Sequence, residues 1–223
     1  MTDKPRSPLE LLDALAVQEV EIDADLRHVE IYTMRGLLTL LWHGPRSAGD
    51  VVVTCGGGMG SLLGPAEGLY HDLGRQLAAQ GIGTMRVGYR KPNDLSRCVH
   101  DVAAAADLAS RGGARRFVVV GHSFGGAVAV QAGVVLGEHC RGVVTLATQS
   151  AGCENAAELT APLLLLHGAG DELLPPETST VVQMLAEQGE VVVIPGTGHL
   201  FGEASDEVRR RVFDWVTDRF DDD

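Results

Sequence analysis

From residue 51 to the C-terminus, short apolar runs alternate with segments of helical periodicity. The runs occupy residues 51–54, 84–88, 116–120, 142–147, 162–167 and 190–194, and the helical segments occupy residues 65–80, 95–110, 124–137, 177–188 and 205–220. Runs such as 163–166, all leucine, have no polar face, so helices must cover both sides of the strands that they form. The alternation predicts an α/β fold with a mostly parallel, twisted sheet between two layers of helices.

The chain before residue 51 predicts an antiparallel addition to this sheet. Residues 17–22, 28–33 and 36–43 have strand character, and the capping-box pair Ser7 and Glu10 predicts a helical extension over residues 1–16. No linker or low-complexity tract divides the chain, so we expect residues 1–223 to form one domain that ends in the acidic tail 221–223. The connection 148–161 is too short for an inserted cap domain.

Charge and cysteine spacing exclude several classes of protein. The 30 acidic and 18 basic residues give a formal net charge of −12, which disfavours nucleic acids and anionic membrane surfaces as partners. No apolar run reaches the roughly 20 residues that cross a bilayer, and the N-terminus lacks the apolar core of a signal peptide. The cysteines form no C-x-x-C pair, so we expect reduced thiols and a cytoplasmic protein.

The stretch Gly121-His122-Ser123-Phe124-Gly125 follows an apolar strand and leads directly into a helical pattern. Such a G-x-S-x-G turn holds its serine in strained backbone geometry, and its glycines are needed because a Cβ would strike the neighbouring strand or helix. The turn exposes the Ser123 hydroxyl at the N-terminus of the helix, where N–H groups stabilise negative charge. Taken alone, the motif is also compatible with an ordinary turn between a strand and a helix.

Two later strand ends carry the other groups that a serine nucleophile needs, a base and a carboxylate that orients the base. Asp171 lies in the loop after strand 162–167, and His199 lies in the loop after strand 190–194. Since the carboxyl ends of parallel strands lie along one edge of a sheet, we expect Ser123, Asp171 and His199 to come together there.

In order and context these motifs resemble those of the α/β-hydrolase family, with G-H-S-F-G-G as the nucleophile elbow, H-G-A-G-D-E-L-L-P as the acid loop and G-T-G-H as the histidine loop. The resemblance covers residues 37–220 and is greatest to small members without a lid, the dienelactone-hydrolase-like proteins and short carboxylesterases. Dienelactone hydrolases themselves have a cysteine where this chain has Ser123. The resemblance implies an α/β-hydrolase fold without a cap domain, the catalytic residues Ser123, Asp171 and His199, and no cofactor.

A glycine-rich loop at residues 55–61 follows strand 51–54. The resemblance implies that its Gly57 N–H, together with the Phe124 N–H, forms the oxyanion hole of the enzyme. Family members commonly begin this loop with His-Gly, whereas this chain begins it with Cys55. The loop lacks the Gly-Lys-Ser/Thr ending of a phosphate-binding loop, so nucleotide binding is disfavoured.

Other residues near these motifs have competing interpretations. Glu172 is a rival to Asp171 for the role of the acid, and His199 taken alone is compatible with a loop histidine that makes structural hydrogen bonds. We expect His122 to be structural and His167 to hydrogen-bond the acid loop. The other histidines lack carboxylate or cysteine partners at metal-ligand spacing, so no metal site is predicted.

The sequence therefore predicts a serine hydrolase that cleaves a small or medium carboxylic ester or thioester through an acyl-enzyme. We expect Met59, Leu63 and Leu174, apolar residues of the loops around Ser123, to line the substrate pocket. The alternative is a binding or regulatory protein that keeps the fold without turnover, because one fold hosts many functions.

Overall fold

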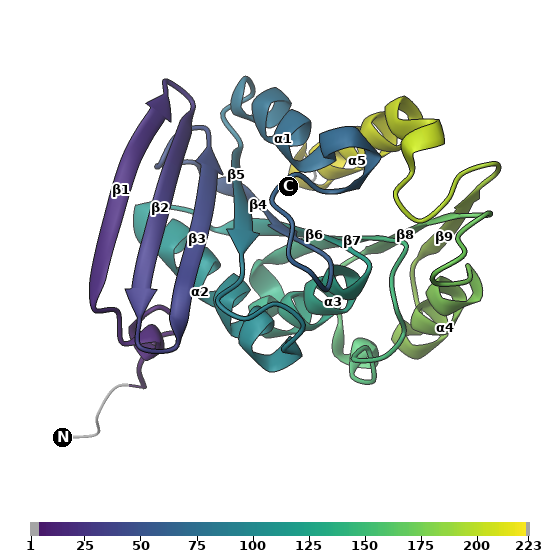
Figure 1. Ribbon diagram of the computed structural model, residues 1–223, viewed down its shortest axis with the longest axis horizontal. Helices are drawn as coiled ribbons and strands as arrows, with labels where there is room; N and C mark the ends of the chain where they lie inside the picture. Colours follow the sequence, from purple (N-terminus) through teal and green to yellow (C-terminus); the bar gives the residue numbers. More distant parts are fainter. Residues whose placement is uncertain (1–4, 222–223) are drawn as a thin grey trace.

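The computed structural model describes residues 5–221, which form a mostly parallel sheet of nine strands between two layers of helices (Figure 1). The strands are β1 (Ala16–Asp23), β2 (Leu26–Thr33), β3 (Gly36–His43), β4 (Asp50–Cys55), β5 (Gly83–Gly88), β6 (Arg116–His122), β7 (Cys140–Leu146), β8 (Leu163–Gly168) and β9 (Glu190–Ile194). The helices are α1 (Pro65–Ala78), α2 (Leu95–Gly112), α3 (Phe124–Leu136), α4 (Glu177–Ala186) and α5 (Ser205–Asp221). The predicted fold class is confirmed, and these elements begin and end within two residues of their predicted bounds.

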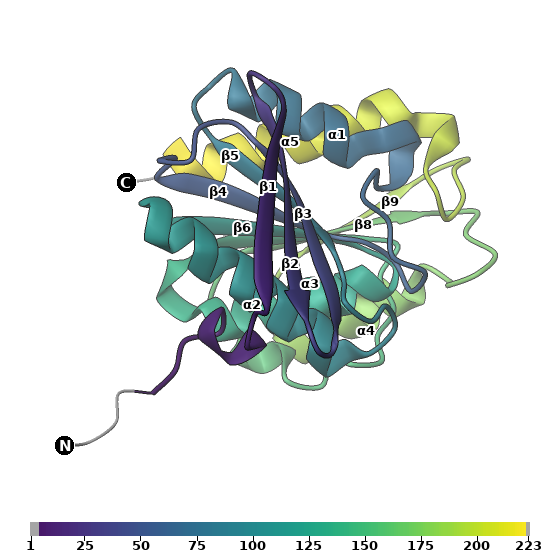
Figure 2. The same ribbon diagram turned by 60° about the vertical axis from the view of Figure 1, so that its left-hand side comes forward.

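The sheet has the order β1-β2-β3-β5-β4-β6-β7-β8-β9. Strands β4 to β9 pair in parallel, and β1, β2, β3 and β5 pair antiparallel, as the sequence predicts for the N-terminal part. The central strands β6 and β8 are apolar and buried along nearly their whole length, because helices cover both of their faces. Strand β1 is an exposed edge strand, seen at the front of Figure 2.

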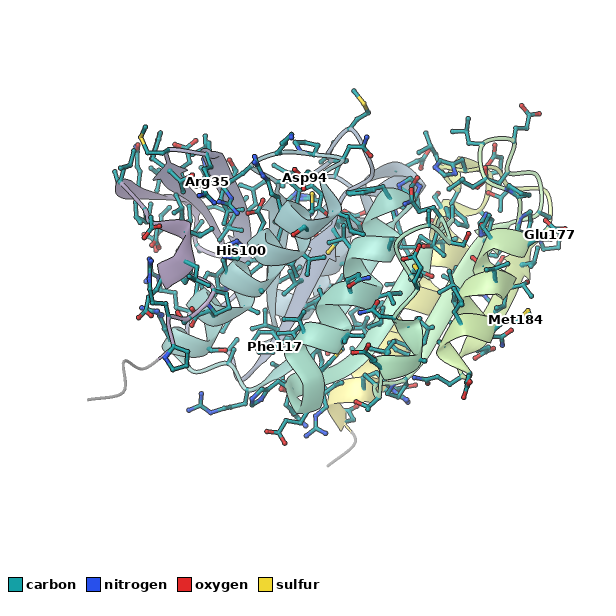
Figure 3. The ribbon with its side chains drawn as sticks, turned by 90° about the horizontal axis from the view of Figure 1, so that it is seen from below. Arg35, Asp94, His100, Phe117, Glu177 and Met184 are labelled. Carbon is teal, nitrogen blue, oxygen red and sulfur yellow. The ribbon has the colours of Figure 1, made fainter. Side chains whose placement is uncertain are left out.

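Helices α1 and α5 cover one face of the sheet, and α2, α3 and α4 cover the other (Figures 1 and 2). Figure 3 looks onto the second face, with Asp94 and His100 at α2 and with Glu177 and Met184 at α4. The core divides accordingly, since alternate residues of each central strand pack into one of two apolar clusters. No helix of the described residues has the length and apolar character needed to cross a membrane.

The connection between β7 and β8 contains only one short 3-10 turn, η3 (Ala156–Glu158). It packs back onto the core through the buried side chains of Cys153, Ala156 and Leu159. Within residues 5–221 no cap domain interrupts the fold or covers the C-terminal edge of the parallel strands. The predicted absence of a cap domain therefore agrees with the structure.

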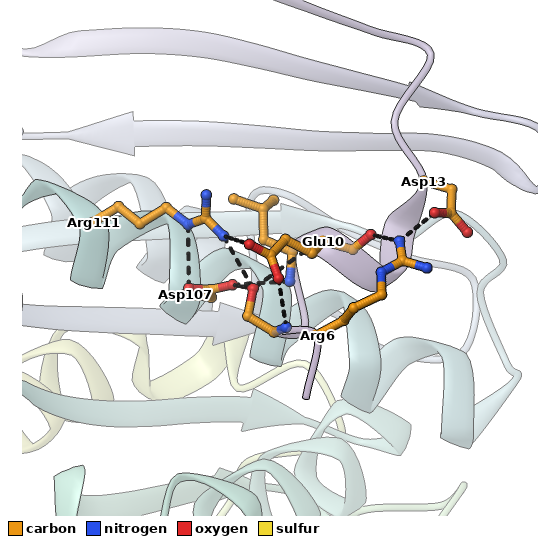
Figure 4. A network of polar contacts seen from close by, with 7 residues as sticks. Arg6, Glu10, Asp13, Asp107 and Arg111 are labelled. Atoms are coloured by element: carbon orange, nitrogen blue, oxygen red, sulfur yellow. Dashed lines mark hydrogen bonds and ion pairs between the residues drawn. The ribbon is translucent and has the colours of Figure 1, made fainter. Parts of the chain in front are cut away.

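The N-terminal segment differs from the helical extension predicted over residues 1–16. Its described part forms only a 3-10 turn, η1 (Glu10–Leu12), and β1 begins at residue 16. The capping box does form, since the Ser7 N–H donates to Glu10 Oε2 at 2.9 Å, but the Ser7 hydroxyl donates to Asp107 of α2 at 2.5 Å. Asp13 then takes a left-handed conformation that ends the turn. The polar network in Figure 4 thus binds the segment to α2, and the segment does not continue as a helix.

The acidic tail predicted at residues 221–223 lies mostly beyond the part of the chain that the structure describes. Asp221 is the last residue of α5. Asp222 and Asp223 lie outside the described residues.

His43, the last residue of β3, is buried where the sheet packs against α1. Burial lowers its pKa to about 4, and the positive charges of Arg86, His71 and Arg75 act in the same direction, whereas Asp23 opposes them. The folded protein therefore keeps His43 neutral at a pH where the unfolded chain, with an ordinary histidine pKa of 6.5, is protonated.

This difference makes stability depend on pH. Because the unfolded state binds more protons between the two pKa values, the free energy of unfolding decreases as the pH falls through that window. We expect His43→Phe to remove about 2 kcal/mol of the stability that the protein loses between about pH 7 and pH 5. Urea denaturation at both pH values measures the effect, and an undiminished loss in the variant would contradict it.

Candidate active site

The site lies at the C-terminal edge of the parallel strands, where β6 turns directly into α3 at Ser123. Ser123 has φ 58° and ψ −122°, a strained conformation for a residue with a side chain. In this turn, main-chain atoms approach one another too closely for side chains to fit between them. A Cβ on Gly121 would lie 1.9 Å from the Gly125 carbonyl oxygen, and a Cβ on Gly125 would lie 2.3 Å from the Cys55 carbonyl oxygen. The predicted strain and the need for both glycines are confirmed.

Asp171 and His199 meet across the loops that follow β8 and β9. His199 Nδ1 lies 2.7 Å from Asp171 Oδ2, and Asp171 Oδ1 accepts hydrogen bonds from the N–H groups of Leu173 and Leu174, both at 2.9 Å. Burial alone raises the pKa of Asp171, but the hydrogen bonds from Leu174, His199 and Leu173 outweigh it and hold the pKa below its usual value. The carboxylate is therefore ionised and is fixed against the imidazole of His199.

His167 of β8 hydrogen-bonds the acid loop, as predicted. Its Nε2 lies 2.9 Å from the Leu174 carbonyl oxygen and 3.2 Å from Asp171 Oδ2, and both partners are acceptors, so Nε2 carries the hydrogen. Its Nδ1 accepts from the Ser179 hydroxyl at 2.7 Å. These side chains do not form a metal site, and within residues 5–221 no group of three or more His, Cys, Asp or Glu residues is arranged to hold a metal ion. Glu172, the rival acid, is exposed and lines the cleft beside His199.

His122, predicted to be structural, contacts the histidine loop. Its Nε2 donates to the His199 carbonyl oxygen at 3.0 Å, and the two imidazole rings lie 4.8 Å apart. Burial lowers the pKa of His122 to about 4, so the ring is neutral. His122 therefore holds the main chain of His199 beside the elbow, while in the described chain no hydrogen bond joins Ser123 Oγ to the His199 ring.

The acid loop and the histidine loop are held together by their main chains. A Cβ on Gly168 would lie 2.4 Å from the Thr197 carbonyl oxygen, and the Gly170 N–H donates to that same oxygen at 2.9 Å. Glu203 accepts from the Thr197 hydroxyl at 3.0 Å and from the Gly198 N–H at 3.2 Å. Sequence reasoning missed Thr197 and Glu203, since only the tertiary structure shows what they bind.

The glycine-rich loop after β4 packs against the elbow. A Cβ on Gly57 would lie 3.7 Å from Ser123 Cβ, and one on Gly58 would lie 3.8 Å from Phe124 Cβ. The Gly60 N–H closes the loop by donating to the Gly57 carbonyl oxygen at 2.8 Å. Among residues 5–221, the N–H groups of Gly57 and Phe124 have no acceptor, so both are free to bind a ligand oxygen.

The apolar residues predicted to line the pocket take different positions. Leu63 lines a cleft of about 490 Å³ together with Pro65, Ala66 and Leu200. Met59 is 94% exposed, and Leu174 is half-buried in the acid loop; neither lines that cleft or the cleft of about 660 Å³ that includes His199. Leu200, which directly follows His199 in the chain, lines both clefts.

Comparisons with known proteins agree with this architecture. A model of the alpha/beta hydrolase family matches residues 65–206, and a search of curated proteins finds no match. Among solved structures, the chain is similar to Est1E from Butyrivibrio proteoclasticus, with 16% identity, a TM-score of 0.73, and coverage of 86% of this chain and 98% of that one. It is also similar to dienelactone hydrolase from Anabaena variabilis, with 18% identity, a TM-score of 0.73, and coverage of 90% and 97%. A serine hydrolase homologue from Coxiella burnetii has 18% identity, a TM-score of 0.69, and coverage of 84% and 95%.

Proposed function

The chain belongs to the alpha/beta hydrolase family, and from this premise we propose that it is a serine hydrolase that cleaves small or medium carboxylic esters or thioesters. The observation that carries the proposal is the 2.7 Å hydrogen bond between His199 Nδ1 and a buried carboxylate of Asp171, next to a serine in strained geometry. With its Nδ1 hydrogen directed at Asp171, His199 keeps a basic lone pair on Nε2. A general base of this kind activates a serine hydroxyl.

In the proposed reaction, His199 Nε2 removes the Ser123 Oγ proton as this oxygen attacks the substrate carbonyl carbon. The carbonyl oxygen becomes an oxyanion that accepts hydrogen bonds from the N–H groups of Gly57 and Phe124. The protonated His199 then gives its proton to the leaving alcohol or thiol, and the acyl group stays on Ser123. Water, deprotonated by the same nitrogen, releases the carboxylic acid and restores the Ser123 hydroxyl.

The absence of a hydrogen bond between Ser123 Oγ and His199 in the described chain favours a second candidate, a binding protein without turnover. Hydrogen bonds between catalytic groups are often long in a free enzyme and shorten when the substrate binds. The ionised Asp171, hydrogen-bonded to His199 Nδ1, leaves the imidazole with a basic Nε2, which a protein that only binds does not need. These features support the hydrolase as the first candidate.

Labelling with a fluorophosphonate distinguishes the two candidates, because only an activated serine reacts with this probe quickly. The wild-type chain is expected to be labelled on Ser123 and to hydrolyse p-nitrophenyl acetate and butyrate. Ser123→Ala serves as the control for labelling at other residues. A wild-type chain that is neither labelled nor active on these esters would favour the binding protein.

The open site predicts a preference for short acyl chains. Each buried methylene contributes at most about 0.8 kcal/mol, and without a cap domain an acyl chain soon extends beyond the cleft lined by Leu63 and Leu200. We expect kcat/KM to be highest for acyl groups of about two to six carbons. A series of esters from acetyl to palmitoyl, measured below and above their micellar concentrations, tests this. A preference for long chains, or a jump in rate at the lipid interface, would contradict it.

A further inference from the structure

Two buried tyrosine hydroxyls bind consecutive carbonyl groups at the start of the glycine-rich loop. Tyr70 of α1 donates to the Cys55 carbonyl oxygen at 2.8 Å, and Tyr89, just after β5, donates to the Gly56 carbonyl oxygen at 3.3 Å. Tyr70 packs in the apolar cluster beneath α1 and α5, whereas Tyr89 packs in the cluster beneath α2 and α3. The two side chains therefore reach the loop from opposite faces of the sheet.

The two carbonyl groups differ in what they control. A peptide unit is planar, with its C=O and N–H pointing in opposite directions. The Gly56 carbonyl belongs to the same unit as the Gly57 N–H, so a donor that fixes this oxygen also fixes the direction of that N–H. The Cys55 carbonyl belongs to the preceding unit, which carries the Gly56 N–H.

Residues 56–58 of the loop need such an external anchor, because they have no side chains that could hold them. Glycine rotates more freely than other residues, and three glycines follow Cys55 in succession. Gly56 cannot gain a side chain, since a Cβ there would lie 2.4 Å from the Ser61 nitrogen. A change in the Gly56 and Gly57 torsions would change the direction of the Gly57 N–H next to Ser123, whose Cβ lies 3.7 Å from the position of a Cβ built on Gly57.

We propose that Tyr89 is a positioning residue that directs the Gly57 N–H at the oxyanion. The inference rests on the proposed serine hydrolase, because it gives Tyr89 a part in stabilising the transition state. The Tyr89 hydroxyl remains protonated, since burial holds its pKa well above the usual value, and the Cys55 thiol beside it is also kept neutral by burial, which raises its pKa. Tyr89 can therefore donate its hydrogen bond to the Gly56 carbonyl oxygen at neutral pH and below.

The chemistry predicts a particular kinetic signature. An oxyanion donor acts on charge that develops in the transition state, so a misdirected donor lowers kcat and leaves KM nearly unchanged. A group that only stabilises the fold would lower the melting temperature without this selective effect. The pH dependence of kcat should be unchanged, because Tyr89 does not transfer a proton in the reaction.

The test compares Tyr89→Phe with Tyr70→Phe on p-nitrophenyl butyrate, with active sites counted by fluorophosphonate titration. Both variants lose one buried hydroxyl bound to a carbonyl, so Tyr70→Phe is the matched control. Tyr89→Phe is expected to lower kcat about tenfold and to weaken binding of a butylboronic acid, a mimic of the tetrahedral intermediate, by a similar factor. Tyr70→Phe is expected to change both by no more than about twofold.

Equal losses in the two variants, or an unchanged kcat in Tyr89→Phe, would overturn the proposal. A Tyr89→Phe chain that no longer folds would also overturn it, because the hydroxyl would then serve stability. Failure of the hydrolase proposal gives a different result, a wild-type chain that is neither labelled nor active. The two proposals can thus be rejected separately.

Discussion

Ser123→Ala is expected to lower kcat for ester hydrolysis by about 10⁶-fold while the protein keeps its fold. The substitution removes the oxygen that would form the acyl-enzyme, and neither His199 nor the oxyanion donors can replace it. The Ser123 side chain makes no hydrogen bond that holds the described structure together. Alanine also has a Cβ, so the strained backbone geometry of the turn is no worse than with serine.

Steady-state kinetics on p-nitrophenyl butyrate measures this loss, and circular dichroism with thermal unfolding checks the fold. The variant should also lose labelling by the fluorophosphonate. Hydrolysis at close to the wild-type rate by a folded Ser123→Ala chain would remove Ser123 from the mechanism.

Asp171→Asn is expected to lower kcat by about 10⁴-fold. The neutral amide has only one acceptor oxygen, whereas the Asp171 carboxylate faces four donors: the N–H groups of Leu173 and Leu174, His199 Nδ1 and His167 Nε2. An amide whose oxygen binds the two main-chain donors must direct its NH₂ at His199, which favours the tautomer with hydrogen on Nε2. That tautomer has no basic lone pair directed at Ser123.

Glu172→Gln is the matched control, because it makes the same chemical change at the neighbouring position. Glu172 is exposed and is not hydrogen-bonded to His199 in the described chain, so the control should lose little activity. The pH profiles of kcat and kcat/KM for both variants separate a tautomer effect from a loss of folded protein. A larger loss in Glu172→Gln would transfer the role of the acid to Glu172.

The fold could be predicted from the sequence because the hydrophobic pattern of each strand and helix lies within that segment of the chain. A continuous apolar strand such as β8 must be covered by helices on both faces of the sheet. The segments of helical periodicity between such strands are the helices that connect them. The segment before β1 could not be predicted in this way, since its capping box favours a helix while Asp107, about a hundred residues further along the chain, binds the Ser7 hydroxyl.

The candidate site was predictable to the same extent. The place of Ser123 in the turn and the pairing of Asp171 with His199 could be predicted because each residue follows its own strand in a characteristic loop, and the catalytic roles of the three residues stay predictions. The hydrogen-bond partners of His122 and Glu203 could not be predicted. His122 binds the main chain of His199, which is distant in the sequence, and Glu203 binds the main chain of Gly198 in a loop without a recognisable motif. The exposure of Met59 likewise depends on the path of the loop.

The frame of the candidate site is packed through main-chain contacts at Gly121, Gly125 and Gly168. The side chains around the opening, among them Leu63, Leu173 and Leu200, are largely exposed and take no part in those contacts. In the proposed hydrolase, substrate preference and the geometry of the triad would therefore depend on separate sets of residues. Single substitutions among the exposed side chains would then change the preferred substrate and leave the main-chain contacts of the frame intact.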